Sequence, residues 1–470
     1  MKEKQIRVVP SAWLEKDDRR LDCGPYLSGK IEAEVLLDRL SVSKPKLHEL
    51  TVGGIDGIIN AGRIRRVWVT DDRFGVPFLS STDILQADLS SLSLIGHQAV
   101  RDNQHLLIKS GYVLVTRSGT TGRMSFSRPD MDGMACSEDV LRVVPDPTKV
   151  PPGFLYAFLR TKFGVPLIAG DTYGSVITHI EPSHVSGIAV PRFGEPAEGA
   201  AHEKILESAR LLAEYQEQVK AATRKLFTAV GLNDITSGEW HNGNPDLGFA
   251  RKLGSPASLR ALNFNPRFQQ LCNTIRAQSW RPLGELCKQG TLKRGGRYKR
   301  IDADPEYAYQ LIGQKEIFWA RPEGRWIARK SVGTDVLVEP GTTLVAAQGT
   351  LGESELFCRA EFIWGPALSA AYSEHLLRVV SNEAMMPRGC LFAFMRSETA
   401  FRMLRSTSMG TKLQDHHPGF LHNLPVPYPD RRQRDEIHEL VTDAYDKRHR
   451  SMKLEDEAVA IVEAAIEGGA

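Results

Sequence analysis

The strongest constraint on the fold is an internal duplication with a fixed spacing. The octapeptide SEDVLRVV at residues 137–144 recurs as SEHLLRVV 236 positions later. The same offset aligns FLYAFLR at 154–160 with CLFAFMR, YGSVITHI at 173–180 with MGTKLQDH, and IAVP at 188–191 with LPVP. Agreement at several places with one spacing indicates that the chain folds as the same unit twice.

Upstream of these blocks the spacing changes. The segment SGYVLVTRSGTTG at 110–122 matches PGTTLVAAQGTLG at an offset of 230, so the two halves differ by insertions in front and keep identical spacing behind. Runs typical of strands occur at 111–117, 141–144, 341–347 and 377–380, and runs typical of short helices occur at 154–162 and 391–397. The sequence therefore predicts an α+β fold with two tandem α/β lobes.

Each half ends in an amphipathic stretch, at about 198–230 and about 430–466. Apolar or small residues recur there at steps of mostly three and four, which is typical of a coiled-coil seam. They are Ile205, Ala209, Leu212, Val219, Ala222 and Leu226 in the first stretch, and Ile437, Val441, Ala444, Leu454, Ala458, Ile461 and Ala465 in the second. A single amphipathic helix often lies on its own lobe. Because both helices occupy equivalent places and their other faces are densely charged, we expect them to form an antiparallel coiled coil.

These patterns divide the chain into a first lobe over 1–196, a helix over 197–232, a polar Gly/Pro-rich linker over 233–260, a second lobe over 261–429 and a second helix over 430–470. The 60 Lys and Arg against 57 Asp and Glu give a net charge of +3, so affinity for nucleic acid must come from local patches. The six cysteines form no CxxC pair, and no long apolar run or signal segment occurs. We expect a cytoplasmic protein with no membrane contact.

A search for catalytic motifs finds no phosphate loop, nucleophile elbow, HExxH helix or dinucleotide fingerprint. The adjacent residues His416 and His417 would point to opposite faces of a strand, and the pair is not duplicated. We interpret it as part of a polar loop before Pro418 rather than as a metal or acid–base site. The sequence indicates no reaction and no metal site.

Basic clusters lie in corresponding parts of the two variable fronts. They are Arg63, Arg65, Arg66 and Arg73 in the first half, and Lys293, Arg294, Arg297, Lys299 and Arg300, with Tyr298 interleaved, in the second. A run of charge is usually a solvated face. Their correspondence favours a shared surface that faces DNA.

The Gly-Thr-x-Gly turns are a second candidate for DNA contact. Arg117, Ser118 and Thr120 lie in the first turn, and Gln348 and Thr350 in the second. Such turns can bring free backbone amides close to phosphate, or they can be tight framework turns that need glycine. Both interpretations remain open. At a base edge, arginine suits guanine and glutamine suits adenine.

The order of these motifs, present twice, resembles the specificity (S) subunit of type I restriction-modification systems. The resemblance implies two target recognition domains, at 1–196 and 261–429, each reading one half of a split double-stranded DNA site, with the two helices as spacer. It implies a non-catalytic chain without a cofactor. The partners would be methyltransferase (M) subunits that use S-adenosylmethionine and a motor-nuclease (R) subunit that uses ATP and Mg²⁺, which together act in phage defence.

The expected helix length agrees with this resemblance. A helix of about 30 residues is about 45 Å long, which exceeds the roughly 34 Å of one duplex turn. Two alternatives stay open. One is a DNA-binding subunit of another phage-defence assembly. The other is a two-lobed enzyme that binds a phosphorylated small substrate at its Gly-Thr-x-Gly loops, with acid–base candidates Glu138, Asp139, Glu374 and His375.

Overall fold

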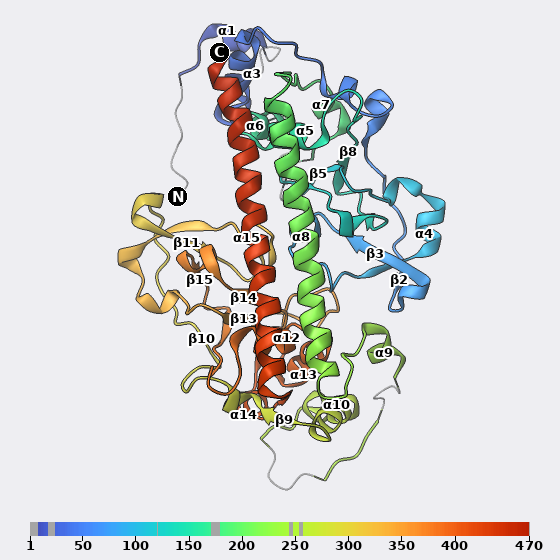
Figure 1. Ribbon diagram of the computed structural model, residues 1–470, viewed down its shortest axis with the longest axis vertical. Coiled ribbons are helices and arrows are strands. Elements are labelled where there is room, and N and C mark those ends of the chain that lie inside the picture. Colours follow the sequence, from blue (N-terminus) through green and yellow to red (C-terminus); the bar gives the residue numbers. More distant parts are fainter. Residues whose placement is uncertain are drawn as a thin grey trace. The chain divides into compact units, whose positions relative to one another are not determined.

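The computed structural model of the chain describes residues 8–16, 24–119, 121–170, 179–243, 248–252 and 257–469. It contains two compact units. Unit 1 comprises Met1–Gln86, Leu92–Ala213 and Arg450–Ala470, and unit 2 comprises Ala87–Ser91 and Glu214–His449. Each unit therefore holds one lobe and a part of each of two long helices, α8 and α15 (Figure 1).

The lobe of unit 1 contains two four-stranded sheets. The first has the order β1-β8-β5-β6, formed by Ile58–Ile59, Val140–Val143, Val113–Thr116 and Met124–Phe126. The second has the order β2-β4-β3-β7, formed by Trp68–Val69, Leu94–Gly96, Gly75–Leu79 and Ala135–Cys136. Strand β5 reads Val-Leu-Val-Thr and is buried along its whole length, as expected for a β-branched run covered on both faces.

The lobe of unit 2 repeats this plan. Its first sheet has the order β10-β16-β13-β14, formed by Lys293–Arg294, Leu376–Val379, Thr342–Ala346 and Ala360–Ile363. Its second has the order β12-β11-β15, formed by Arg325–Ala328, Ala308–Ile312 and Ala371–Tyr372. Two further pairs are β17 with β18 and β19 with β9, formed by Ser408–Gly410, Gln414–His416, Pro425–Pro427 and Trp280–Pro282.

Corresponding strands have the same partners and register, which confirms the predicted pair of α/β lobes. Leu114 of β5 faces Arg142 of β8, and Leu344 of β13 faces Arg378 of β16. In the second sheets, β3 and β7 are parallel, as are β11 and β15. The duplication in the sequence is therefore a duplication of hydrogen-bonded topology.

Short helices complete each lobe. In unit 1 they are α1 Ser11–Lys16, α2 Gly24–Leu27, α3 Lys30–Arg39, α4 His97–Asp102, α5 Pro152–Arg160, α6 Gly164–Ala169 and α7 Pro182–Ser186. In unit 2 they are α9 Ser237–Asn242, α10 Pro266–Arg276, α11 Leu283–Leu286, α12 Arg388–Met395, α13 Glu398–Ser406 and α14 Pro418–His422. Helices α5 and α12 carry the repeated FLYAFLR and CLFAFMR segments and are almost wholly buried, because both faces are apolar.

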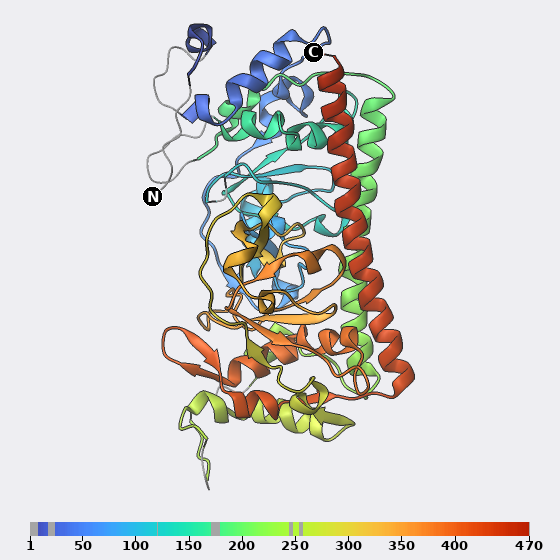
Figure 2. The same cartoon turned by 90° about the vertical axis from the view of Figure 1, so that its left-hand side faces the viewer.

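The two long helices are α8, Ala197–Thr228, and α15, Arg431–Gly468. Helix α8 ends where Gly231 adopts a left-handed φ of 73° and the Leu232 N–H donates to the Phe227 carbonyl at 2.9 Å. Helix α15 begins after Asp430, whose carboxylate accepts the Gln433 N–H at 2.8 Å. Figures 1 and 2 show the helices side by side and running in opposite directions, as expected from the sequence.

Within unit 1, the first part of α8 packs against the last part of α15. The apolar contact consists of Ala201, Ile205, Ala209, Ala458, Val462 and Ile466. Beside it, Lys204 Nζ lies 2.5 Å from a carboxylate oxygen of Glu457. The hydroxyl oxygens of Ser208 and Ser451 lie 2.8 Å apart in the buried seam. The seam is thus mainly apolar, with an ion pair at its side and one buried hydrogen bond between serines within it.

Within unit 2, the rest of α8 packs against the first part of α15. The apolar contact consists of Val219, Ala222, Leu226, Ile437, Val441 and Ala444. Lys225 Nζ lies 2.6 Å from Glu436 across the pair. The rings of Tyr215 and Tyr445 meet edge to face, with centroids 5.2 Å apart. The predicted antiparallel pairing is therefore present in each unit.

Individual seam positions differ from the simple heptad. Leu212 and Ile461, which the spacing places in the seam, are half-buried, whereas Leu454 is buried. Between Tyr445 and Leu454 the sequence offers no large apolar residue at a seam position. Arg448 and Ser451 occupy that stretch and are buried. The middle of the pair is polar.

A histidine on each long helix caps a lobe helix in the same way. The Gly153 N–H at the start of α5 donates to His202 Nδ1 at 3.0 Å, and the Gly389 N–H at the start of α12 donates to His438 Nδ1 at 3.1 Å. Burial lowers the pKa of both histidines, which favours the neutral ring that can accept these bonds. The repeat spacing of 236 thus extends into the helices.

Unit 2 includes the short segment Ala87–Ser91. The Leu89 N–H donates to Gln216 Oε1 at 2.6 Å, and Asp88 lies 2.5 Å from the guanidinium of Arg396. Burial raises the pKa of Asp88, but the charge of Arg396 outweighs it and holds that pKa well below its usual range. A half-buried carboxylate paired with a buried arginine therefore fixes this segment.

Candidate nucleic-acid interface

One ion pair is repeated in the two lobes. Arg66 lies 2.9 Å from Glu138 in unit 1, and Arg300 lies 2.7 Å from Glu374 in unit 2. The two glutamates are corresponding residues of the repeated Ser-Glu block, so each lobe fastens the segment after β1 or β10 to that block. The guanidinium of Arg66 also lies 5.3 Å from the ring centroid of Phe78. Arg66 and Arg300, both predicted to bind DNA, thus hold the lobe frame.

The remaining basic side chains divide into paired and unpaired ones. Arg294 lies 2.8 Å from Asp415, and Arg73 lies 2.5 Å from Asp71. Within the described ranges, no carboxylate pairs with five exposed cations on these segments, namely Arg63, Arg65, Lys293, Arg297 and Lys299. These five are the positive charges available to an external anion such as a phosphate.

Tyr298 packs inside its lobe. It contacts the apolar cluster of unit 2 formed by Leu311, Ile327, Val336 and Ala371. Burial raises its pKa to about 12. The aromatic residue that the sequence placed among the basic cluster therefore supports the fold from within.

Two exposed aromatic residues occupy corresponding positions, and sequence reasoning missed both. Phe74 directly precedes β3 and is 60% exposed, and Tyr307 directly precedes β11 and is 66% exposed. Each ends a short 3-10 turn that begins after an aspartate, Asp71 or Asp304. That aspartate three positions before an aromatic is the local signal, but it lies at an offset of 233 and is easily overlooked.

The glycines of the first Gly-Thr-x-Gly turn have a framework role. Gly119 and Gly122 adopt left-handed φ angles of 75° and 83°, which favour glycine. The Gly122 N–H donates to the Thr116 carbonyl at 2.9 Å and is therefore already satisfied. This geometry is that of a tight strand-closing turn.

The polar side chains of this turn contact the protein itself. Arg117 pairs with Glu181 and donates from Nε to the Ile180 carbonyl at 3.0 Å. Ser118 Oγ donates to Asp139 at 2.7 Å. Thr120 lies outside the described residues.

The second turn is fixed by hydrogen bonds from side chains elsewhere in the lobe. Arg405, which is buried, donates to the carbonyls of Leu351 at 2.8 Å and Gly352 at 2.9 Å. The backbone N–H of Gln348 donates to the Gln314 side chain at 3.1 Å, and Thr350 is half-buried.

The backbone also settles which residues of the two turns correspond. Arg117 donates its N–H to the Asp139 carbonyl as Ala347 does to the His375 carbonyl. Gln348 therefore corresponds to Ser118 rather than to Arg117. The contrast between an arginine and a glutamine in the two turns does not compare equivalent positions.

The His416 and His417 pair differs from the expected polar loop. His416 ends β18 and is buried, with its ring stacked on Phe357 at a centroid distance of 5.1 Å. His417 instead caps α14. One ring is packed in the core and the other caps a helix, so the two side chains do not converge on one site.

Acid should destabilise the chain through His416. Burial lowers its pKa from 6.5 to about 4, so the unfolded chain takes up the proton more readily. Its stabilising contribution is present above pH 6.5 and is lost as the pH falls through 4, by about 3 kcal/mol. The urea concentration at the unfolding midpoint should decrease between pH 7.5 and pH 4.5 in the wild-type chain. The decrease should be smaller in His416→Phe. An equal fall in both would contradict this role.

Three of the four acid–base candidates of the enzyme alternative are bound to neighbouring side chains, and the fourth, His375, has its Nε2 3.7 Å from a carboxylate oxygen of Glu374. Glu138 and Glu374 are bound to arginines, and Asp139 accepts the Ser118 hydroxyl. Burial raises the pKa of Glu374, but its hydrogen bond with Arg300 outweighs this and lowers it. A carboxylate held ionised in an ion pair is a poor general acid.

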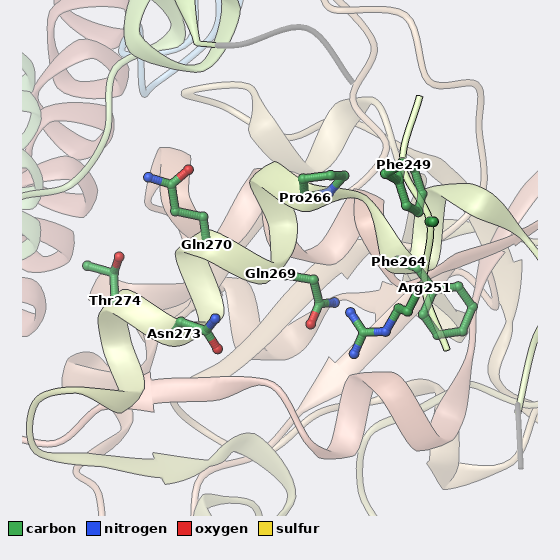
Figure 3. A pocket seen from close by; sticks show the side chains of 9 residues that line it. Phe249, Arg251, Phe264, Pro266, Gln269, Gln270, Asn273 and Thr274 are labelled. Carbon is green, nitrogen blue, oxygen red and sulfur yellow. The ribbon is translucent and has the colours of Figure 1, made fainter. Parts of the chain in front are cut away.

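A hollow of about 580 Å³ lies between residues 248–252 and α10 of unit 2 (Figure 3). Arg251 extends over the Phe264 ring at 5.4 Å, and Gln269 and Asn273 line the opposite side. Within the described residues its lining contains no carboxylate, histidine or cysteine. The hollow therefore offers amide groups and one cation but no acid–base pair.

Two further features are absent from the described ranges. No group of three or more His, Cys, Asp or Glu side chains is placed to hold a metal ion. None of the described helices is long and apolar enough to cross a membrane.

The fold and the surface together define a duplicated α+β protein with an antiparallel pair of long helices and unpaired cations on corresponding segments. No protein-family model matches the chain, and no curated protein matches it. Solved structures do. The chain is similar to the S subunit of a type I restriction-modification system from M. genitalium, with 11% identity and a TM-score of 0.37 over 92% of this chain and 96% of that one.

Two other structures are similar over comparable lengths. The HsdS subunit from Thermoanaerobacter tengcongensis is 14% identical, with a TM-score of 0.28 over 91% of this chain and 97% of that one. A chain from work on complex assembly and conformational transition of the type I R-M system is 15% identical, with a TM-score of 0.27 over 91% and 98%.

Proposed function

We propose that this chain is the DNA-specificity subunit of a type I restriction-modification complex, a non-catalytic protein whose two lobes each read one half of a split duplex site. The observation that carries the proposal is that the two lobes share the same backbone arrangement and the same ion pair but carry different exposed side chains. The Arg66–Glu138 and Arg300–Glu374 pairs fix the same segment in both lobes. The exposed residues around them differ, as two different half-sites require.

The unpaired cations supply affinity in this proposal, and other residues supply sequence choice. Arg63 and Arg65 in one lobe and Lys293, Arg297 and Lys299 in the other would contact phosphates and release counterions. Methylation and cleavage belong to partners, a methyltransferase that uses S-adenosylmethionine and a motor nuclease that uses ATP and Mg²⁺. This chain holds no cofactor of its own and acts in the cytoplasm, where the DNA is.

Deletion of the gene tests the proposal directly. Single-molecule methylation calling on the host genome should show a split motif that disappears on deletion and returns on complementation. The tagged chain should co-purify with a methyltransferase. A genome whose methylation is unchanged, with a different co-purifying enzyme, would assign the chain to another defence assembly. A chain that purifies alone and turns over a phosphorylated metabolite would support the enzyme alternative.

Exchange of the first lobe should change one half of the recognised sequence. Residues 21–191 are replaced by the equivalent lobe of a relative with a known split motif. The methylated motif should then combine the donor's half-site with the unaltered half-site of this chain, because each lobe carries its own frame and its own exposed residues. A change in both halves would contradict independent reading.

A further inference from the structure

The turns before β3 and β11 are built in the same way. Asp71 accepts the N–H of Arg73 at 2.9 Å, and Asp304 accepts the N–H of Glu306 at 3.1 Å. In both turns the N–H of the following aromatic residue donates to the carbonyl of that aspartate, at 3.0 and 2.9 Å. Both turns lead into a strand that runs parallel to β7 or β15. The two turns are therefore equivalent parts of the lobe frame.

Each turn projects two neighbouring side chains into solvent. The aromatic side chains of Phe74 and Tyr307 are among the most exposed of their kind in the described residues. The residue before each is also exposed, with Arg73 at 76% of its side chain. Trp68 of β2 adds a further exposed aromatic ring to one lobe, as Trp326 of β12 does to the other. Repeated exposure of large apolar surface at one place in a frame marks a contact site.

The two turns keep the aromatic residue and reverse the charge beside it. Arg73 and Glu306 occupy the same position in the two turns, two residues after the capping aspartate and directly before the aromatic residue. A surface that met two copies of one partner protein would carry the same charge twice. A surface that must distinguish two base sequences has to differ at the residue that reads them. The reversal therefore favours DNA as the occupant.

Resting on the proposed function, we propose that these turns are the base-reading elements of the two lobes, with Arg73 and Glu306 as specificity-determining residues. Arg73 selects guanine, since its guanidinium fits the O6 and N7 acceptors. Glu306 selects cytosine, since a carboxylate accepts from the N4 amino group. Phe74 and Tyr307 lie against the neighbouring base, where an apolar ring suits a thymine methyl group.

The present contacts of Arg73 leave it free to move to DNA. The Arg73 side chain is 76% exposed where it pairs with Asp71, and an ion pair at the surface changes an equilibrium about a few-fold. A bidentate contact with guanine discriminates by roughly 5- to 150-fold. Asp71 keeps the backbone hydrogen bond that shapes the turn when the guanidinium leaves. Glu306 has no ion-pair partner among the described residues and is already available.

The experiment replaces each reading residue in the full chain and reads the methylated motif in the host. Arg73→Gln should change one G·C pair to A·T in one half of the motif, because glutamine fits adenine. Arg73→Lys should keep guanine at that position with weaker discrimination. Glu306→Gln should change one C·G pair to A·T in the other half. Arg101→Gln on α4 and Glu285→Gln on α11 remove the same charges elsewhere and should leave the motif unchanged.

Each other outcome overturns the proposal. An unchanged motif with normal methylation in Arg73→Gln and Glu306→Gln would show that the turns do not read bases. Reduced methylation of an unchanged motif, with less methyltransferase co-purifying, would assign the turns to a partner protein. Failure of the proposed function is distinguishable, because the wild-type chain would then support no split motif at all.

Discussion

Replacing Arg448 with methionine is expected to lower the free energy of unfolding by about 3–5 kcal/mol, because it leaves a buried carboxylate without its counter-charge. Arg448 Nη1 lies 2.8 Å from Glu361 Oε1, and both side chains are 5% exposed. Nη2 also donates to the Trp319 carbonyl at 2.5 Å. The loss would be measured by urea titration of the full-length chain at neutral pH.

The double variant Glu361→Leu/Arg448→Met is the matched control. Removing both charges leaves no unpaired ion, and such replacements are often close to neutral. The double variant should therefore recover most of the stability that Arg448→Met loses. Tyr445, whose hydroxyl donates to Glu361 at 2.6 Å, still faces the site and keeps its contact with the Phe362 N–H at 3.2 Å. Equal losses in the single and double variants would show that packing, not charge, explains the effect.

The Arg448→Met variant should also acquire a new pH dependence. Burial raises the pKa of Glu361, and Arg448 opposes this. Without Arg448 the pKa of Glu361 should rise further. The folded variant then keeps the Glu361 proton at pH values above about 4.3, where the unfolded chain has released it. The contribution of Glu361 to stability is then most favourable below that pH and becomes less favourable as the pH rises toward the raised pKa. Relative to the wild-type chain, the variant should be less impaired at pH 5 than at pH 8.

These polar residues explain how a seam with a gap still specifies one pairing. Ser208 and Ser451 bond within unit 1, and Arg448 and Glu361 within unit 2. A shift of one helix along the other by a turn would separate the buried hydroxyls of Ser208 and Ser451, whereas the Arg448–Glu361 pair fixes α15 against strand β14 of its lobe. A polar layer in an apolar seam is the best-attested device for fixing helix register.

The sequence predicted the parts of the fold whose signals are local or repeated. Strands β5 and β13, helices α5 and α12 and both long helices follow from β-branched runs and apolar periodicity. Their correspondence follows from the constant offset of 236, which the His202 and His438 caps share. The spacing is constant where residues of one repeat form hydrogen bonds within that repeat, because an insertion between them would break those bonds.

The sequence did not predict features that depend on distant partners. Arg448 looks like an exposed charge on a helix, yet its partner Glu361 is 87 residues away in the chain. Tyr298 looks like an aromatic ring among DNA-binding cations, yet a sheet formed later in the chain covers it. Phe74 and Tyr307 were overlooked because their shared signal, an aspartate three residues before each, lies at an offset of 233 rather than 236. Burial and pairing of this kind are set by tertiary contacts.

Removing Arg297 and Lys299 together should weaken DNA binding by the assembled complex roughly 30-fold near 0.15 M salt. Both are exposed and have no carboxylate partner in the described part of unit 2. If each contacts one phosphate, Arg297→Ala/Lys299→Ala should also reduce the slope of log K against log salt by about 1.8. Fluorescence anisotropy of a labelled duplex carrying the methylated motif, between 50 and 200 mM KCl, measures both quantities.

Two control variants separate phosphate contact from net charge and from lobe structure. Arg431→Ala/Arg432→Ala removes two exposed charges from the start of α15 and should leave the slope unchanged. Arg300→Ala should reduce the slope by less than the roughly 0.9 expected for one phosphate contact, because its guanidinium is bound to Glu374. The loss of Arg300 should instead loosen the lobe. A slope reduced equally by the α15 variant and by Arg297→Ala/Lys299→Ala would mean that the complex responds to total charge. The segment after β10 would then not be the surface that meets the phosphates.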